Sequence, residues 1–539
     1  MSFNPDFISF RFISLKLFFL IFCFSILPLV GCIEVSSIKT EKSTPNSLKK
    51  LNLFDIDPNN NATSVKRDAN IILKFNTQLD PSTIKSNLEN NTCSGTIQIS
   101  SNNFKTCLKI NNLHLFNNNK NLLLKPTRVY KANAIYKIRV TKNLKAKNGT
   151  SLKDDFITSS GFRTTWSHQL GTSGDDYGIE ITVDSKENIY VTGLTSANKN
   201  SNEKDLFLTK FSMNGYQKWI IQAGFDRSVT KAVLKTNDNN KIVLGAYSNE
   251  KEKSALLISN YSFNGKKIFA KTIPLNGESR GNGLTIDKEG NIYVTSVTPF
   301  DILKIGGEGK KIWGNQLNPD IEINDLDVDK SNNLYITGIM KNSLDGKTSK
   351  GGSDIFLLKI SHMGPKIWSR TFGSKNDESA TSIAIKSDDS IAISGYITQS
   401  KSFNDIKIVN KDAFVAKYSK EGELKWTHIF KGKKSQACTV SKWTAEGSLL
   451  VGGYTEGSLE GQNYIGKEDS FLAKFNDVGD LIWIKQFGTE ENERPLGIGV
   501  GNEGQIYVTG FSEGQIDGAQ YNGGRDIFIV KYNKNGIKQ

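Results

Sequence analysis

The chain has 539 residues, long enough for two or three domains, and its 37% hydrophobic and 10% aromatic content excludes a disordered chain. With 47 Gly, 11 Pro and 4 Met, the composition favours many short strands joined by turns over long helices. The net charge of +14 is unevenly placed, because residues 32–165 carry +12 and residues 166–539 carry about +1.

The first 31 residues are predicted to be a targeting segment that is not part of the fold. An apolar run over residues 17–30 follows two basic residues and is too short for a membrane-spanning helix. It ends in Leu29-Val30-Gly31-Cys32, which resembles the lipobox of bacterial lipoproteins at all four positions. The resemblance implies a signal peptide over 1–31, a lipid on Cys32 and a place in the outer membrane, facing the periplasm or the cell surface. An ordinary signal peptide or an uncleaved anchor is the alternative.

Residues 32–50 are mostly polar, show no period and are predicted to form a flexible tether. Residues 51–165 contain apolar or alternating runs bounded by Asn, Pro and Gly, which predict about seven short strands and therefore a β-sandwich. The clearest runs are Asn70–Phe75, Thr96–Ser100, Asn121–Lys125 and Ile135–Val140.

Four short motifs of this segment resemble the bacterial Ig-like domain of many exported proteins. They are Asp57-Pro58, Leu79-Asp80-Pro81, Tyr136–Val140 and Phe162–Thr165. The resemblance implies a spacer or adhesive module rather than an enzyme. The basic charge of the same segment suits anionic lipid head groups or acidic polysaccharide, or is a solvated surface needed only for solubility. Nucleic acid is excluded as a partner if the chain is exported.

Four cysteines remain once the signal peptide is removed. Cys93 and Cys107 lie in one segment of a chain sent to an oxidising compartment, which favours a disulfide, with two buried thiols as the alternative. Cys438 is left over and is predicted to pack as a small apolar residue in a strand.

A repeat of about 53 residues starts at residue 166 and decides the fold of the C-terminal two-thirds. Its most regular mark is an aromatic residue at Trp166, Trp219, Phe269, Trp313, Trp368, Trp426 and Trp483. Each unit then passes an acidic loop, two strands such as Ile179–Val183 and Asn188–Gly193, and an Asp-x-Phe strand entry such as Asp354–Phe356. A Gly-x-x-x-Trp turn leads to the next unit. Four short strands in about 50 residues are typical of one β-propeller blade.

The two ends of the repeat region predict how the propeller closes. The chain stops where another Trp strand is due, and the region opens with an unpartnered one, Trp166–Gly171. We therefore expect this strand to complete the last blade, residues 496–533, and close a ring of seven blades. The repeat resembles the SBBP family, seven-bladed β-propeller repeats of bacterial surface and secreted proteins. Repeat two departs from the pattern at Ala255–Ile258, and repeat six at Cys438 and Trp443.

Motifs of common enzymes are not found in the sequence. His168 and His428 occupy equivalent repeat positions expected to face the outer rim, and no His pair has metal-binding spacing. Acidic loops such as Asp175-Asp176 and turns such as Asp184–Asn188 offer too few ligands for a dedicated Ca²⁺ loop, and the turns are predicted to be hairpin caps. No catalytic residue, metal or cofactor is expected, with calcium as the alternative.

The sequence thus favours a non-enzymatic binding lipoprotein, a monomer that presents propeller loops to a protein or glycan partner. The variable loops 195–204, 340–352 and 397–411 are the first candidates for the contact. Two alternatives stay open: a lyase or hydrolase acting in the central channel, and a scaffold for envelope assembly. A cluster of acidic, Arg and Tyr side chains at one mouth of the channel would favour the enzyme.

Overall fold

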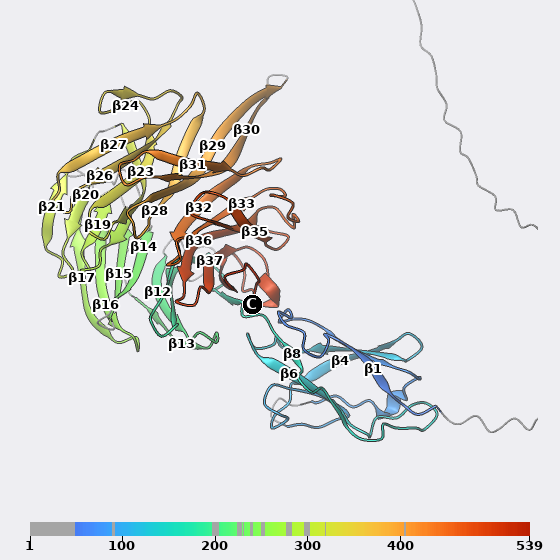
Figure 1. The fold of residues 1–539 in the computed structure, drawn as a ribbon. Coiled ribbons are helices and arrows are strands. Elements are labelled where there is room, and N and C mark those ends of the chain that lie inside the picture. The colour runs from blue at the N-terminus through green and yellow to red at the C-terminus, as the bar shows by residue number, and fades with distance from the viewer. Residues whose placement is uncertain are drawn as a thin grey trace, which may run out of the picture. The chain divides into compact units, whose positions relative to one another are not determined.

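The computed structural model describes residues 49–539 except 89–91, 197–203, 224–228, 230, 238–240, 249–253, 276–282, 296–301, 318–319 and 404–405 (Figure 1). The regular elements of these residues are β-strands and two short 3₁₀ helices, η1 (Pro81–Thr83) and η2 (Ile516–Gly518), which confirms the all-β class. No helix among them is long and apolar enough to cross a membrane. The predicted signal peptide, Cys32 and the tether up to residue 48 lie outside the described residues.

The bacterial Ig-like segment consists of two four-stranded sheets. One has the strand order β1-β2-β5-β4, and the other has the order β3-β6-β7 with β8 also paired to β6. The strands are β1 (Leu53–Asp57), β2 (Ile71–Phe75), β3 (Ile97–Ser100), β4 (Ile110–Phe116), β5 (Asn121–Pro126), β6 (Ile135–Val140), β7 (Phe156–Ile157) and β8 (Phe162–Arg163). Strands were predicted at β2, β3, β5 and β6, and all four are confirmed.

One hydrophobic core lies between these two sheets, because alternate residues of each strand point inward. In β2, for example, Ile71 and Leu73 are fully buried. Tyr130, Tyr136 and Phe162 form an aromatic cluster in the same core, with ring centroids 4.8 to 5.8 Å apart. The aromatic cluster joins the loop before β6 to both β6 and β8.

The described residues after β8 form seven antiparallel four-stranded sheets, which Figure 1 shows side by side. The first three contain β10 (Tyr177–Val183), β11 (Ile189–Thr195), β12 (Asp205–Phe211), β13 (Gln217–Gln222); β14 (Lys231–Asn237), β15 (Lys241–Ser248), β16 (Ala255–Ser262), β17 (Lys267–Pro274); and β18 (Leu284–Ile286), β19 (Ile292–Thr295), β20 (Ile302–Ile305), β21 (Lys311–Asn315). Each sheet therefore runs in chain order, as the repeat predicts.

The remaining four sheets keep this order, with one insertion and one strand from earlier in the chain. They contain β22 (Ile321–Val328), β23 (Leu334–Met340), β26 (Asp354–Ile360), β27 (Lys366–Phe372); β28 (Asp377–Ile385), β29 (Ile391–Phe403), β30 (Ile406–Tyr418), β31 (Leu424–Ile429); β32 (Gln436–Trp443), β33 (Leu449–Thr455), β34 (Asp469–Phe475), β35 (Leu481–Phe487); and β36 (Glu493–Val500), β37 (Ile506–Ser512), β38 (Asp526–Tyr532), β9 (His168–Leu170). Strand β9 pairs antiparallel with β38, from Leu170 opposite Ile527 to His168 opposite Ile529.

The variable loops chosen from sequence differ in structure. Residues 340–352 contain a small hairpin, β24 (Ser343–Leu344) with β25 (Lys347–Thr348). Residues 397–411 were predicted to be a loop, but most of them extend β29 and β30, which pair as far as Phe403 opposite Ile406. The two strands keep one register, without a bulge, from Ile391 opposite Tyr418 to Phe403 opposite Ile406. Most of the loop 195–204 lies outside the described residues.

Acidic side chains cap the turns of the repeat, as predicted. The Asp184 carboxylate accepts hydrogen bonds from the backbone N–H groups of Lys186 and Asn188, at 2.9 Å each. Equivalent bonds form at Asp287 and Asp329. The Asp of Asp-x-Phe also accepts backbone amides ahead of its strand, for example from Lys350 to Asp354 at 3.1 Å. These bonds satisfy amides that the turns leave without a strand partner.

Four of the Gly-x-x-x-Trp turns, those that begin at Gly215, Gly364, Gly422 and Gly479, pack on the Trp of the preceding unit. The Trp166 indole N–H donates to the Met213 carbonyl at 3.0 Å, and Gly215 lies against the same ring. A Cβ added at Gly215 would lie 3.1 Å from Trp166 Nε1, and the φ of Gly215 is +81°, so both space and backbone favour glycine. Trp313 and Gly364 repeat the arrangement, with an indole bond of 2.9 Å to the His362 carbonyl. The motif therefore connects consecutive sheets.

Candidate functional site

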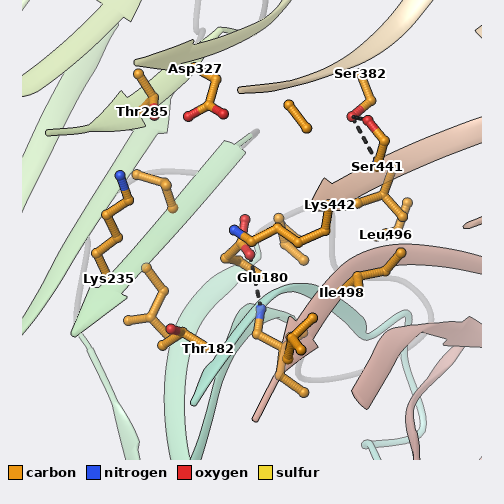
Figure 2. Close-up of a pocket in the computed structure, with 18 of the residues that line it drawn as sticks. Glu180, Thr182, Lys235, Thr285, Asp327, Ser382, Ser441, Lys442, Leu496 and Ile498 are labelled. Carbon is orange, nitrogen blue, oxygen red and sulfur yellow. Dashed lines mark hydrogen bonds between the residues drawn. The ribbon is translucent and has the colours of Figure 1, made fainter. Parts of the chain in front are cut away.

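The first strands of the seven sheets surround a common cavity. They are β10, β14, β18, β22, β28, β32 and β36; each contacts the next, and β36 contacts β10. Residues of all seven line a cavity of about 470 Å³, the channel site, of which Figure 2 shows a part. Because these strands are the innermost of their sheets, their free edges leave backbone groups facing this space.

Six charged side chains line the channel site, and their charges balance. Three are carboxylates and three are lysines: Glu180, Asp325, Asp327, Lys231, Lys235 and Lys442. They come from four separate strands, so no local motif brings them together. A channel enzyme was expected to show a cluster of acidic, Arg and Tyr side chains. The lining contains the acidic side chains, but its other charged residues are lysines, and the described residues that form it include no Arg or Tyr.

Two of the carboxylates have a structural task. Asp325 accepts a hydrogen bond from the backbone N–H of Ile383 at 3.0 Å, and Asp327 accepts one from Ile385 at 2.8 Å. Both bonds run from β28 to β22, so the carboxylates satisfy amides at the free edge of the next sheet. Lys231 lies 3.8 Å from Asp325 and balances part of its charge. Burial raises the pKa of Asp325, and Lys231 partly offsets this.

Other side chains join the innermost strands in the same way. Ser382 and Ser441 share a hydrogen bond of 3.0 Å between β28 and β32. The Trp443 indole N–H donates to the Ala384 carbonyl at 3.1 Å, and the Lys235 ammonium donates to the Ile286 carbonyl. Burial lowers the pKa of Lys235, which Asp327 partly offsets. Much of the lining therefore stabilises the arrangement of the sheets.

Glu180 and Lys442 are the charged pair least committed to this framework. Both side chains project into the space in Figure 2, and Lys442 is exposed there. Glu180 accepts a hydrogen bond only from its neighbouring Ile181 amide, at 3.3 Å, among the bonds that the described residues make. Burial raises the pKa of Glu180, although Lys442 acts in the opposite direction. Thr182, Thr285, Ser382 and Ser441 add hydroxyl groups. The site can hold a polar ligand and exchange a proton with it.

The residues singled out from sequence lie elsewhere. Cys93 and Cys107 form a disulfide with Cα atoms 4.9 Å apart in the Ig-like segment. Cys438 is fully buried in a hydrophobic cluster, as predicted, and burial raises the pKa of its thiol. Trp166 is 1% exposed, and the other repeat aromatics are partly buried at the outer strands, at Trp219, Phe269, Trp313, Trp368, Trp426 and Trp483.

The two repeat histidines pack against aromatic rings rather than lining the channel site. The His168 ring lies 4.9 Å from that of Trp166 and 4.8 Å from that of Phe211. Burial lowers the pKa of His168 to about 3, with a contribution from Arg67. His428 lies 3.8 Å from Glu460. Within the described part of the chain, no group of three or more His, Cys, Asp or Glu residues could hold a metal ion.

Sequence reasoning missed the channel residues. Glu180 and Asp325 occupy the same register position of their sheets, where other repeats have uncharged residues such as Ser382 and Gly497. A charge at a strand position that is uncharged in several repeats was the signal available, but its meaning depends on which face of the strand meets the axis.

Two family models match the chain. Residues 49–164 match the bacterial Ig-like domain, and residues 165–198 match the SBBP β-propeller repeat. Together with the sheets, these matches define an Ig-like domain followed by a β-propeller. The chain is also 29% identical over 189 residues to the regulatory protein FlaEY of Caulobacter vibrioides, a match covering 32% of this chain and 20% of that protein. The match thus spans about a fifth of that relative's length.

Solved structures with a related arrangement share little sequence with the chain. Virginiamycin B lyase of Staphylococcus aureus has 15% identity and a TM-score of 0.41, covering 67% of this chain and 98% of that one. An ulvan lyase has 10% identity and a TM-score of 0.42, and the match covers 68% of this chain and 97% of the lyase. An α-L-arabinanase of Penicillium chrysogenum has 8% identity and a TM-score of 0.36, and the match covers 69% of this chain and 98% of the arabinanase.

Proposed function

We propose that the protein is a membrane-anchored, non-enzymatic binding lipoprotein whose seven-bladed propeller takes part of a protein or glycan partner at the channel site. The cavity carries the proposal, because it combines balanced charges, hydroxyl groups and a volume of about 470 Å³. Polar ligands are bound where a few fixed polar groups converge in a cavity of this size. Much of the charged lining is committed to structure, which favours binding over catalysis.

Closure of the ring by β9, the strand that begins two residues after Trp166, belongs to the same proposal. Three observations support it: β9 pairs with β38, the Trp166 indole bonds to the first sheet, and β36 contacts β10. A closed ring keeps the innermost strands in place, and the channel site depends on their spacing. Such a ring leaves no unpaired sheet between its ends.

The binding proposal is tested with the chain of residues 33–539, which retains the whole compact unit. We expect a glycan or peptide array to return a ligand, and Lys442→Gln and Glu180→Gln to weaken its binding at least tenfold. Lys218→Gln, on the exposed face of β13, is the matched control and should leave affinity unchanged. Arrays that stay empty with and without calcium, or a ligand indifferent to both channel variants, would refute the proposal.

The anchoring proposal needs a separate measurement in cells that make the full chain. Labelled palmitate should enter the wild-type protein and not the Cys32→Ala variant, because the thiol of Cys32 is the predicted attachment point. Incorporation that survives the substitution would contradict this part.

A channel enzyme is the second candidate, and the pair Glu180 and Lys442 is the observation that favours it. Burial raises the pKa of the Glu180 carboxyl group, and a carboxyl group in such an environment can act as a general acid or base. Turnover of a bound glycan by the wild-type chain, lost in Glu180→Gln while binding persists, would establish the enzyme instead.

A further inference from the structure

The Ig-like domain carries its positive charge unevenly, and the sheet alternation shows where. In β6, Tyr136, Ile138 and Val140 point into the core, so Ile135, Lys137 and Arg139 point outward. Phe162 is buried in the same core, which turns its neighbour Arg163 outward, and Arg163 pairs across from Ile135. Ile157 of β7 pairs across from Arg139.

These five outward residues define the basic face: Ile135, Lys137, Arg139, Ile157 and Arg163. The neighbouring positions on β3, Gln98 and Ser100, carry no charge and are buried. The Arg139 guanidinium donates to Gln98 Oε1 at 2.7 Å and lies 4.4 Å over the Phe104 ring, so Lys137 and Arg163 are the cations of the basic face that these contacts leave for a partner. The nearest acids in sequence, Asp154 and Asp155, lie in the loop before β7, where Asp155 accepts the Lys142 amide at 2.9 Å. The strands of this sheet therefore present three cations and no carboxylate on their outer side.

The opposite sheet is different. Its strands carry two outward cations, Lys74 and Lys125, and two outward carboxylates, Asp55 and Asp57, and Lys74 forms an ion pair with Asp55 at 2.8 Å. Among the outward strand positions of the domain, the excess positive charge therefore lies on the sheet that contains β6. Solubility alone has no need for such a difference between the two sides of one sandwich.

The apolar residues of the basic face indicate the kind of partner. Ile135 is 41% exposed and Ile157 is 46% exposed, on either side of the cations. A membrane interface offers both phosphates for cations and a less polar layer for such side chains, whereas an acidic polysaccharide offers mainly charge. A sheet surface is also extended enough to lie on a bilayer.

The position of the domain in the chain agrees with this partner. It directly follows the predicted tether, and residues 33–48 would span at most about 55 Å when fully extended. A single lipid-bearing residue at position 32 would therefore keep the basic face within reach of the membrane surface.

We infer that the basic face docks on anionic lipid head groups and lays the Ig-like domain against the membrane. The inference rests on the proposed lipid anchor for its biological setting, but the contact itself needs no lipid on Cys32. Each Lys or Arg at an anionic surface changes the partition coefficient by about fivefold at low salt. The double variant Lys137→Gln with Arg163→Gln should therefore bind about 25-fold more weakly than the wild type.

The experiment measures co-sedimentation of unlipidated residues 33–539 with phosphatidylcholine vesicles, with and without phosphatidylglycerol. The matched control is Lys120→Gln with Lys125→Gln, which removes the same charge from β5 and the turn before it, and thermal melts check the folding of all three proteins. Binding that needs phosphatidylglycerol, weakens with salt and drops in the first variant only would support the inference. Equal loss in the control, no binding to either vesicle, or binding to polygalacturonate without vesicle binding would overturn it. Palmitate labelling tests the anchor independently, so the two failures are distinguishable.

Discussion

Substitution of Trp166 gives the sharpest test of how the propeller is held together. Its side chain is 1% exposed, its indole N–H donates to the Met213 carbonyl at 3.0 Å, and its ring lies 5.4 Å from that of Tyr507. Its hydrophobic cluster combines residues of the first and last sheets, such as Ile189 and Ile529. Truncation of a buried Trp costs about 3–5 kcal/mol, and the unsatisfied carbonyl adds about 1 kcal/mol. Trp166→Ala should therefore lower the free energy of unfolding by about 4–6 kcal/mol.

Urea unfolding followed by circular dichroism measures this change. Trp313→Ala is the matched control, because Trp313 makes the same kind of indole bond to the His362 carbonyl but is only partly buried within a central sheet. Trp166→Phe removes the hydrogen bond and part of the buried ring, and should cost less than Trp166→Ala. If Trp166→Ala is no more destabilising than Trp313→Ala, then Trp166 does not join the first and last sheets in the way argued above.

Three further predictions concern the last sheet. A Cβ at Gly497 would lie 2.8 Å from the Ile179 carbonyl oxygen, so Gly497→Val should cost about 2–3 kcal/mol in thermal unfolding, and an unchanged Tm would contradict the close approach. Burial and the nearby Asp176 raise the pKa of Asp526 to about 6. The wild type should therefore lose up to about 3 kcal/mol relative to Asp526→Asn as pH rises from 4 to 6, and parallel pH profiles of unfolding would refute this. Because burial lowers the pKa of His168 to about 3, the wild type should lose stability relative to His168→Gln as pH falls below about 6.5, measured in the same assay.

Local features of the fold could be predicted from sequence because their causes are local. The turn Asp184–Asn188 closes on bonds between residues two to four apart, and the strand Asn188–Gly193 needs only its own pattern of apolar residues to be recognised. Repetition then strengthens each assignment, since the same pattern recurs in unit after unit. The pairing of Cys93 with Cys107 was also within reach, because they are the two cysteines of one exported segment.

The length of the hairpin at residues 391–418 was not predictable in this way. The two strands of this hairpin, β29 and β30, continue past their neighbours in the sheet. Strand β28 pairs with β29 only as far as Thr398, and β31 pairs with β30 only from Phe414. Residues 397–411 were predicted to be a variable loop, while pairing between the two strands decided otherwise.

The sequence by itself determined the all-β class, the repeat, the turn caps and the positions of the buried aromatics, since each depends on neighbours along the chain or on a period. Only the tertiary structure decided that Glu180, Asp325 and Lys442 line one cavity, because they lie far apart in the chain on strands of three different sheets. It also decided that Lys137 and Arg163 share one face, since this follows from how β6 pairs with β8. Convergence of distant side chains is a property of strand pairing and sheet packing, which a single repeat does not encode.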